Sequence, residues 1–422
     1  MSVRDDTKEV YGMAQEAHGA LHDLLAVRGV TRRDFLKYCG SVAAMLGLSE
    51  TMAPQIAAAL EGAPKLMPAL WLNGGSCTGC TESIAQVDTP DVATIVLDYL
   101  SFEYFETIMA AAGSWAEKNI TKRAEEGGYI LIYEGSVMTG QDGNTLFVGG
   151  GPENEGAKKG IEILEEAAKN AAAVIAVGSC AVDGGWIYGY PNASEATGVA
   201  AWLQHKGITT PVVSMPTCPV NPEWVVAMVV QLLLVADRDP AKFLQVTPMV
   251  KVPYTDAITG EKVTLLMPKA IYGQTIHDNC PRRGHFENGE FVTELGSKEE
   301  AMGYCLYKVG CKGPQTFTQC PVTRWNRRAS WCVESGAPCI GCGGLNWVDN
   351  NSPFLKRMSD MRIGDTFVQP GTIGAAVGAV AAAGLVVHGI GMKAAGRIGD
   401  GPPMEEMKAY DRKRLAKKGG DK

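Results

Sequence analysis

Residues 172–180 read AAVIAVGSC, an apolar run of strand length that ends in a glycine, a serine and a cysteine. Short apolar runs bounded by glycine are typical of strands buried in a parallel sheet. Comparable runs lie at residues 69–72, 94–100, 129–133 and 211–215, and sequence of helical character separates them. This alternation predicts an α/β fold built on a parallel sheet.

Cysteines follow three of the predicted strands, each just past the strand end. Cys77 and Cys180 follow the dipeptide Gly-Ser, and Cys218 follows Pro-Thr. The carboxyl ends of parallel strands meet at one edge of a sheet, where open α/β sheets bind their ligands. We therefore expect Cys77, Cys80, Cys180 and Cys218 to converge there. Four thiolates at one point suit a 4Fe-4S cluster.

A second group of cysteines lies beyond about Pro268, where regular alternation gives way to glycine- and proline-rich sequence. Its members are Cys280, Cys305, Cys311, Cys320, Cys332, Cys339 and Cys342. Their number predicts two further clusters. Because the segment has little periodic apolar sequence, we expect the metal bonds of these clusters to hold it together. His277 precedes Cys280 by three residues and is expected to supply a fourth ligand, although a lone histidine is more often an ordinary surface or core residue.

Composition narrows the class of protein. The chain has 422 residues, enough for two or three domains, and its 50 glycines suit close-packed loops around a bulky inorganic group. A formal net charge of -7, with no basic stripe interleaved with aromatic residues, argues against nucleic-acid binding. Disulfides and zinc sites are alternatives for the 12 cysteines. Disulfide-dense chains are normally small, however, and zinc would need fewer thiols.

The amino-terminal region carries a twin-arginine pattern at Thr31–Lys37, followed by an apolar stretch at 38–60 that Glu50 and Pro54 interrupt. This pattern predicts a twin-arginine export signal over residues 1–63, and the stretch is too broken to be a spanning helix. An amphipathic helix with two surface arginines is the alternative. Because this export route is associated with proteins that load cofactors before crossing, it favours metal ligation by the later cysteines.

An uncharged run rich in alanine and valine occupies residues 371–390. At about 1.5 Å per residue, a helix of this length just spans a bilayer of roughly 30 Å; a buried helix of a soluble protein is the alternative. The basic tail of residues 393–422 is expected to stay in the cytoplasm, which places the folded body outside. His388 could face a haem of a partner subunit or lie at the membrane interface, and the sequence leaves its role open.

Six stretches carry a resemblance to a known family. They are Thr31–Lys37, Cys77–Ser83, Gly178–Ala181, His277–Arg283, Cys305–Pro314 and Pro338–Cys342. Over nearly its whole length the chain closely resembles the small, electron-transferring subunit of membrane-bound uptake nickel–iron hydrogenases. The resemblance implies a flavodoxin-like domain with the proximal cluster at 64–266, an irregular iron–sulfur domain with the medial and distal clusters at 267–365, and a C-terminal membrane-anchor helix at 371–392.

The resemblance also implies which residues hold three clusters. The proximal 4Fe-4S cluster falls on Cys77, Cys80, Cys180 and Cys218, the distal 4Fe-4S cluster on His277, Cys280, Cys305 and Cys311, and the medial cluster on Cys320, Cys339 and Cys342. Typical members hold a 3Fe-4S medial cluster and have proline at the position of Cys332. We expect Cys332 to add a fourth thiolate and make the medial cluster 4Fe-4S; a buried free thiol is the alternative.

A small subunit of this kind implies a large subunit, whose nickel–iron site splits hydrogen. No catalytic residue is expected in this chain, because no pair of CxxC motifs is left to bind nickel. Electrons would pass from the proximal through the medial to the distal cluster, and then to a membrane cytochrome b or quinone-reactive subunit at the periplasmic face of the membrane. The competing functions are an iron–sulfur subunit of a quinone-linked respiratory dehydrogenase and a non-enzymatic exported metal-binding protein.

Overall fold

The computed structural model describes residues 67–87, 100–150, 156–234, 240–355, 361–363, 366–368 and 370–395, together with Lys37, Gly40, Ala409 and Lys413. The twin-arginine pattern and the basic tail therefore lie almost wholly outside the described residues. The chain divides into two compact units, Met1–Arg357 and Met358–Lys422.

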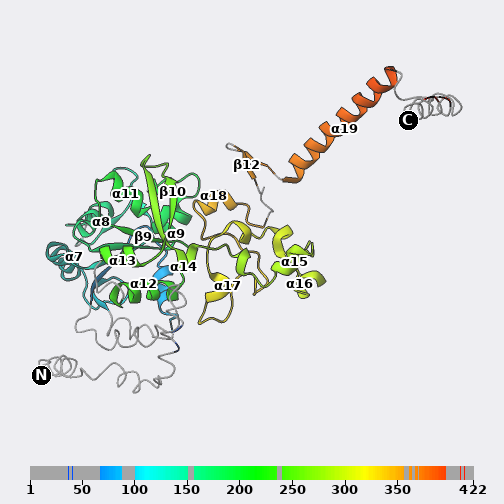
Figure 1. Cartoon of the computed structure of the whole chain (residues 1–422). Helices are drawn as coiled ribbons and strands as arrows, with labels where there is room; N and C mark the ends of the chain where they lie inside the picture. Colours follow the sequence, from blue (N-terminus) through cyan, green and yellow to red (C-terminus); the bar gives the residue numbers. More distant parts are fainter. Residues whose placement is uncertain are drawn as a thin grey trace, which may run out of the picture. The chain divides into compact units, whose positions relative to one another are not determined.

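The first unit is built on a seven-stranded sheet of strand order β10-β11-β9-β7-β3-β1-β2 (Figure 1). Its strands are β1 (Met67–Asn73), β2 (Leu100–Phe105), β3 (Ile130–Glu134), β7 (Ala173–Val177), β9 (Val212–Met215), β10 (Met249–Thr255) and β11 (Lys262–Pro268). All neighbours are parallel except β10 and β11, which form an antiparallel hairpin at one edge. The predicted α/β fold with a parallel sheet is confirmed.

One predicted strand lies almost wholly outside the described residues. The sequence led us to expect it at residues 94–100, but β2 begins at Leu100, and residues 88–99 lie outside those that the structure describes. β2 reads LSFEYF and is partly exposed, because it is an edge strand with one neighbour. Its polar and apolar residues alternate, a pattern that a search for continuous apolar runs misses.

The centre of the sheet is apolar on both faces. All residues of β3 and β7 are buried, as expected for strands that helices cover on each side. α7 (Ser114–Glu126) and α8 (Gly160–Lys169) pack together on one face, whereas α12 (Pro222–Leu234) and α13 (Pro240–Val246) lie on the other (Figure 1). The remaining elements of this part are α5 (Gly79–Ile84), β4 (Val137–Met138), β5 (Phe147–Val148), β6 (Lys158–Lys159), α9 (Gly178–Asp183), α10 (Gly185–Tyr188), β8 (Ala196–Thr197) and α11 (Val199–His205).

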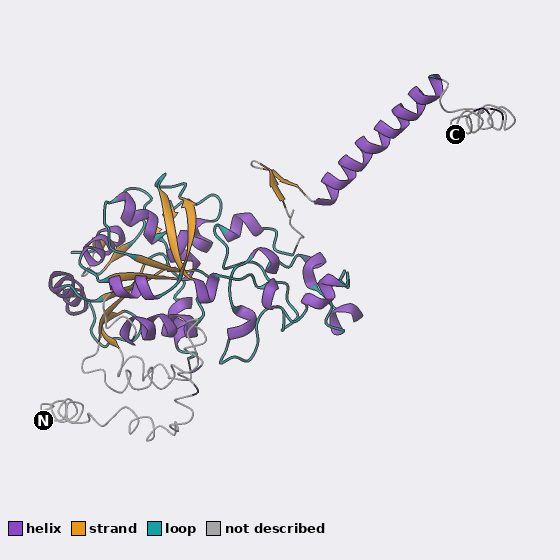
Figure 2. Cartoon of the chain, viewed as in Figure 1, coloured by secondary structure: helices purple, strands orange, loops and turns teal. Residues whose placement is uncertain are grey.

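Beyond the sheet the chain forms only short helices joined by loops, up to about residue 355 (Figure 2). They are α14 (Lys269–Tyr272), η4 (His277–Asn279), α15 (Arg283–Glu287), α16 (Lys298–Ala301), η5 (Leu306–Val309), η6 (Gly313–Gln315), α17 (Cys320–Thr323) and α18 (Trp347–Asn351). This segment belongs to the same compact unit as the sheet. The Trp224 indole N–H of α12, for example, donates to Thr323 Oγ1 at 2.9 Å. The domain boundaries expected from the sequence stay predictions.

The described part of the second unit contains a short hairpin and a long helix. β12 (Met361–Ile363) pairs antiparallel with β13 (Thr366–Val368), and α19 spans Pro370–Ala394. Within α19, residues Ala376–Ala394 have a mean hydropathy of 1.5 and are unburied, and this stretch is long and apolar enough to cross a membrane. The predicted C-terminal hydrophobic helix is confirmed.

Candidate metal centres

Four cysteines line one cavity at the carboxyl edge of the sheet. Cys77 follows β1, Cys80 lies in α5, Cys180 lies in α9, and Cys218 follows β9. A Cβ added at Gly178 would lie only 2.5 Å from Cys80 Sγ, so glycine is needed there for the two loops to approach each other. The structure thus brings together the four residues that the sequence assigned to the proximal cluster.

The surroundings of this cavity suit an iron–sulfur cluster. Burial, together with neighbouring negative groups, raises the pKa of Cys80 and raises that of Cys218 to about 12. Thiols in such a place need a metal cation to become thiolates. Thr217 also lines the cavity, and its buried hydroxyl has no hydrogen-bond partner among the described residues. A cluster sulfur would accept that hydrogen bond, so the residues present fit a 4Fe-4S cluster.

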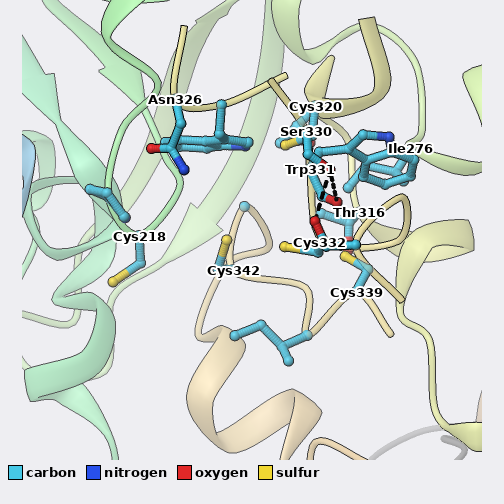
Figure 3. Close-up of a pocket in the computed structure, with 16 residues that line it drawn as sticks. Cys218, Ile276, Thr316, Cys320, Asn326, Ser330, Trp331, Cys332, Cys339 and Cys342 are labelled. Carbon is cyan, nitrogen blue, oxygen red and sulfur yellow. Dashed lines mark hydrogen bonds between the residues drawn. The ribbon is translucent and has the colours of Figure 1, made fainter. Parts of the chain in front are cut away.

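The medial set lies around a cavity of about 330 Å³ in the segment beyond the sheet. Cys320, Cys332, Cys339 and Cys342 all line it, and Figure 3 shows them gathered around one space. The Gly341 N–H lies 3.3 Å from Cys339 Sγ, within hydrogen-bonding distance. Cys332 is exposed, but so are two proximal donors. The structure therefore places Cys332 with the other medial donors, and its ligation stays a prediction.

The distal set lines a third cavity. His277 and Cys280 come from η4 and its end, and Cys305 and Cys311 flank η5. Burial, together with the positive charge of Arg283, lowers the pKa of His277. A lowered pKa favours the neutral imidazole, which is the form that binds metals. The predicted distal donors are thus assembled around one cavity.

The three cavities are neighbours in a fixed order. Cys218 lines both the proximal and the medial cavity. The Ser179 hydroxyl, beside the proximal donor Cys180, donates to the carbonyl of the medial donor Cys342 at 2.6 Å. On the other side, the Lys312 N–H donates to the carbonyl of Cys339 at 2.7 Å, which joins the medial to the distal loops. The 11 cysteines that the structure describes are free thiols, so the disulfide alternative has no support among them.

Two family profiles match the sequence. The C-terminal profile of the NiFe/NiFeSe hydrogenase small subunit matches residues 272–355, and the profile of the NADH ubiquinone oxidoreductase 20 kDa subunit matches residues 77–232. The small chain of the quinone-reactive Ni/Fe-hydrogenase of Wolinella succinogenes is 36% identical over 375 residues, which cover 87% of this chain and 97% of the relative. This chain belongs to the small subunits of nickel–iron hydrogenases.

Further relatives agree with this family. The uptake hydrogenase small subunit of Azotobacter vinelandii is 38% identical to this small subunit, with 87% of the chain and 94% of the relative covered. Among solved structures, the NiFeSe hydrogenase of Desulfovibrio vulgaris Hildenborough matches with a TM-score of 0.62 and 34% identity, over 70% of this chain and 99% of that one. The respiratory-dehydrogenase alternative is matched over residues 77–232 by a family profile, whereas the hydrogenase relatives match most of the chain.

Membership of this family defines the enzyme. The chain is the electron-transfer subunit of a hydrogenase and works with a large subunit as a heterodimer. The predicted family, fold class and function are confirmed at this level. Family membership does not by itself establish the number and types of clusters, the residues that bind them, or the cellular location.

Sequence reasoning missed one buried acid beside the proximal cavity. Glu134 ends β3 and is 2% exposed. Its carboxylate accepts hydrogen bonds from the backbone N–H groups of Cys80 and Thr81, both at 2.9 Å, and from the Thr81 hydroxyl. Glu134 thereby fixes the start of α5, which carries a proximal donor. A polar residue directly past the predicted apolar run of residues 129–133 was the available signal, because cysteines follow the neighbouring runs in a similar way.

Proposed function

We propose that this small subunit holds three iron–sulfur clusters and carries electrons from the nickel–iron site of the large subunit to a membrane acceptor. The proximal cluster would be held by Cys77, Cys80, Cys180 and Cys218, the medial by Cys320, Cys332, Cys339 and Cys342, and the distal by His277, Cys280, Cys305 and Cys311. Bound clusters supply one-electron redox chemistry, and the chain supplies their positions.

The order of the three cavities carries this proposal. Cys218 lines both the first and the second cavity, and a backbone hydrogen bond from Lys312 to Cys339 links the second to the third. Adjacent cavities keep each transfer step short. The distal set is the natural exit, because a neutral imidazole replaces a thiolate and leaves that end less negative.

The acceptor is proposed to be a cytochrome b or quinone-reactive subunit in the membrane. A relative is named as the small chain of a quinone-reactive hydrogenase, and α19 provides an apolar helix of spanning length. We propose that α19 anchors the chain, that the basic tail stays in the cytoplasm, and that a twin-arginine signal exports the body to the periplasmic face.

Metal and sulfide analysis of the heterodimer tests the cluster content. About 12 iron atoms in the small subunit, with a matching amount of acid-labile sulfide, support three 4Fe-4S clusters. One or two metal ions without sulfide would refute the proposal. Hydrogen uptake coupled to a quinone analogue in membranes, and its loss when α19 is deleted, tests the acceptor and the anchor.

Electron paramagnetic resonance of the oxidised protein tests the role of Cys332. A 4Fe-4S medial cluster is silent in this state, whereas a 3Fe-4S cluster gives a strong signal. We expect silence in the wild type and the 3Fe-4S signal in Cys332→Pro. The matched control is Cys39→Ser, which removes a cysteine of the predicted signal region and should change nothing. A strong 3Fe-4S signal in intact, anaerobically prepared wild type would show that Cys332 does not bind iron.

A further inference from the structure

Lys312 is among the largest side chains that the fold buries completely, with 1% of its surface exposed. It directly follows Cys311, a distal donor, and its backbone N–H binds the carbonyl oxygen of Cys339, a medial donor. A Cβ added at Gly341, between the last two medial donors, would lie 3.1 Å from Lys312 Cβ. Lys312 therefore lies in the wall between the medial and distal cavities.

The backbone of this wall is held firmly. The Thr316 hydroxyl donates to the Lys312 carbonyl oxygen at 2.8 Å, and the Gln315 N–H donates to the same oxygen at 3.1 Å. These contacts close a turn around Lys312, and the hydroxyl contact is itself buried. A side chain that leaves this turn has little freedom to reach water, so its amine stays within the protein.

A buried ammonium group is unfavourable unless negative charge lies close to it. Lys312 adjoins a thiol-bearing donor of each cavity: Cys311 directly precedes it in the chain, and Cys339 accepts its backbone N–H at 2.7 Å. When these sulfurs bind iron as thiolates, each of the two clusters carries a share of negative charge. The lysine then lies between two anionic groups in a medium of low dielectric constant, where charges interact strongly.

We propose that Lys312 is a positioning residue for electron transfer, whose fixed positive charge raises the reduction potentials of both the medial and the distal cluster. This inference rests on the proposed cluster content. Reduction adds one negative charge to a cluster, and a nearby cation stabilises the reduced form. The proximal cluster, beyond the medial one, should be affected least.

Redox titration of the purified heterodimer, followed by electron paramagnetic resonance, tests the proposal. In Lys312→Met the medial and distal potentials should both fall, while the proximal potential stays unchanged. Lys312→Arg keeps the charge and should restore the two potentials toward the wild-type values. Lys308→Met is the matched control: this exposed lysine lies four residues earlier, over the ring of Phe291, and water screens its charge.

The remaining outcomes also decide the question. Unchanged medial and distal potentials in Lys312→Met, or an equal fall in Lys308→Met, would overturn the proposal. If Lys312→Met loses a cluster, Lys312→Gln provides a second neutral variant. Cluster loss in both neutral variants but not in Lys312→Arg supports a need for the charge, and loss in all three contradicts it. Absence of three clusters in the wild type would instead refute the proposed function.

Discussion

The sheet of residues 67–268 and the segment of residues 272–355 belong to one compact unit but are stabilised in different ways. In the sheet, β3 and β7 are buried throughout and helices cover both faces. In the later segment the helices are three to five residues long, and loops dominate (Figure 2). Helices so short are not stable by themselves, so their positions depend on what they are attached to.

The two regions therefore position their cluster donors in different ways. The proximal donors lie at the edge of a sheet whose own apolar core positions them. The medial and distal donors lie in a segment with few core residues, in which metal bonds must replace apolar burial. Cluster binding is therefore expected to be mainly a redox property in the first region and a folding requirement in the second.

Removal of the clusters should produce the largest effect. Anaerobic chelation of iron is expected to abolish amide protection across residues 272–355, while the strands of the sheet keep theirs. Hydrogen–deuterium exchange followed by mass spectrometry measures both regions in one sample. Reconstitution with iron and sulfide should restore protection. Equal loss of protection in β3 and β7 would break the contrast between the regions.

A matched pair of leucine substitutions sharpens the comparison. Leu131 in β3 and Leu306 in η5 are 0% and 1% exposed. Leu131→Ala should lower the free energy of unfolding by about 2–5 kcal/mol with or without clusters, because it leaves a cavity in the sheet core. Leu306→Ala should destabilise only the cluster-loaded protein. Denaturant unfolding of both forms is the measurement, and an equal effect of Leu306→Ala in the cluster-free form would contradict the prediction.

Asp183 links the two regions and should make their association depend on pH. Its carboxylate, in α9, accepts the backbone N–H of Asn346 at 2.6 Å, and burial raises its pKa to about 6. The folded pKa lies above the unfolded value of 3.8, so the folded state binds the proton more tightly. The free energy of unfolding therefore falls as pH rises, by about 1 kcal/mol between pH 5 and 7.

Asp183→Asn should abolish this pH dependence, because an amide does not titrate. Denaturant unfolding at several pH values between 5 and 7 compares the variant with the wild type. Glu125→Gln, which neutralises an exposed acid on α7, is the control and should keep the wild-type slope. A slope unchanged in Asp183→Asn would assign the pH dependence to another group.

The smallest effect is expected for a substitution beside the proximal cluster. Glu134→Gln keeps the shape of the side chain but removes a buried negative charge beside the proximal donors. The proximal potential should rise, because the reduced cluster no longer faces that charge, and the medial and distal potentials should change little. Redox titration of the three clusters measures this pattern. Loss of the whole 272–355 segment in the variant would show that the two regions are less independent than proposed.

Much of the fold could be predicted because its signals are local. The runs at 69–72, 129–133 and 172–177 correspond to β1, β3 and β7, and each is a continuous apolar stretch. β2 was not predicted beyond its first residue, Leu100, because this edge strand alternates polar and apolar residues. β10 and β11 were not predicted, since their half-exposed hairpin shows the same alternation. Strands are easiest to predict where both faces are buried.

The candidate site divides in the same way. The sequence by itself determined which cysteines and which histidine are the candidate ligands, because the residue types and their close spacing can be read directly from it. Only the tertiary structure decided that Cys218 lines two cavities, that Glu134 holds the start of α5, and that Lys312 is buried between two cavities. Burial and long-range contacts arise from packing between distant segments, and no local pattern of residues encodes them.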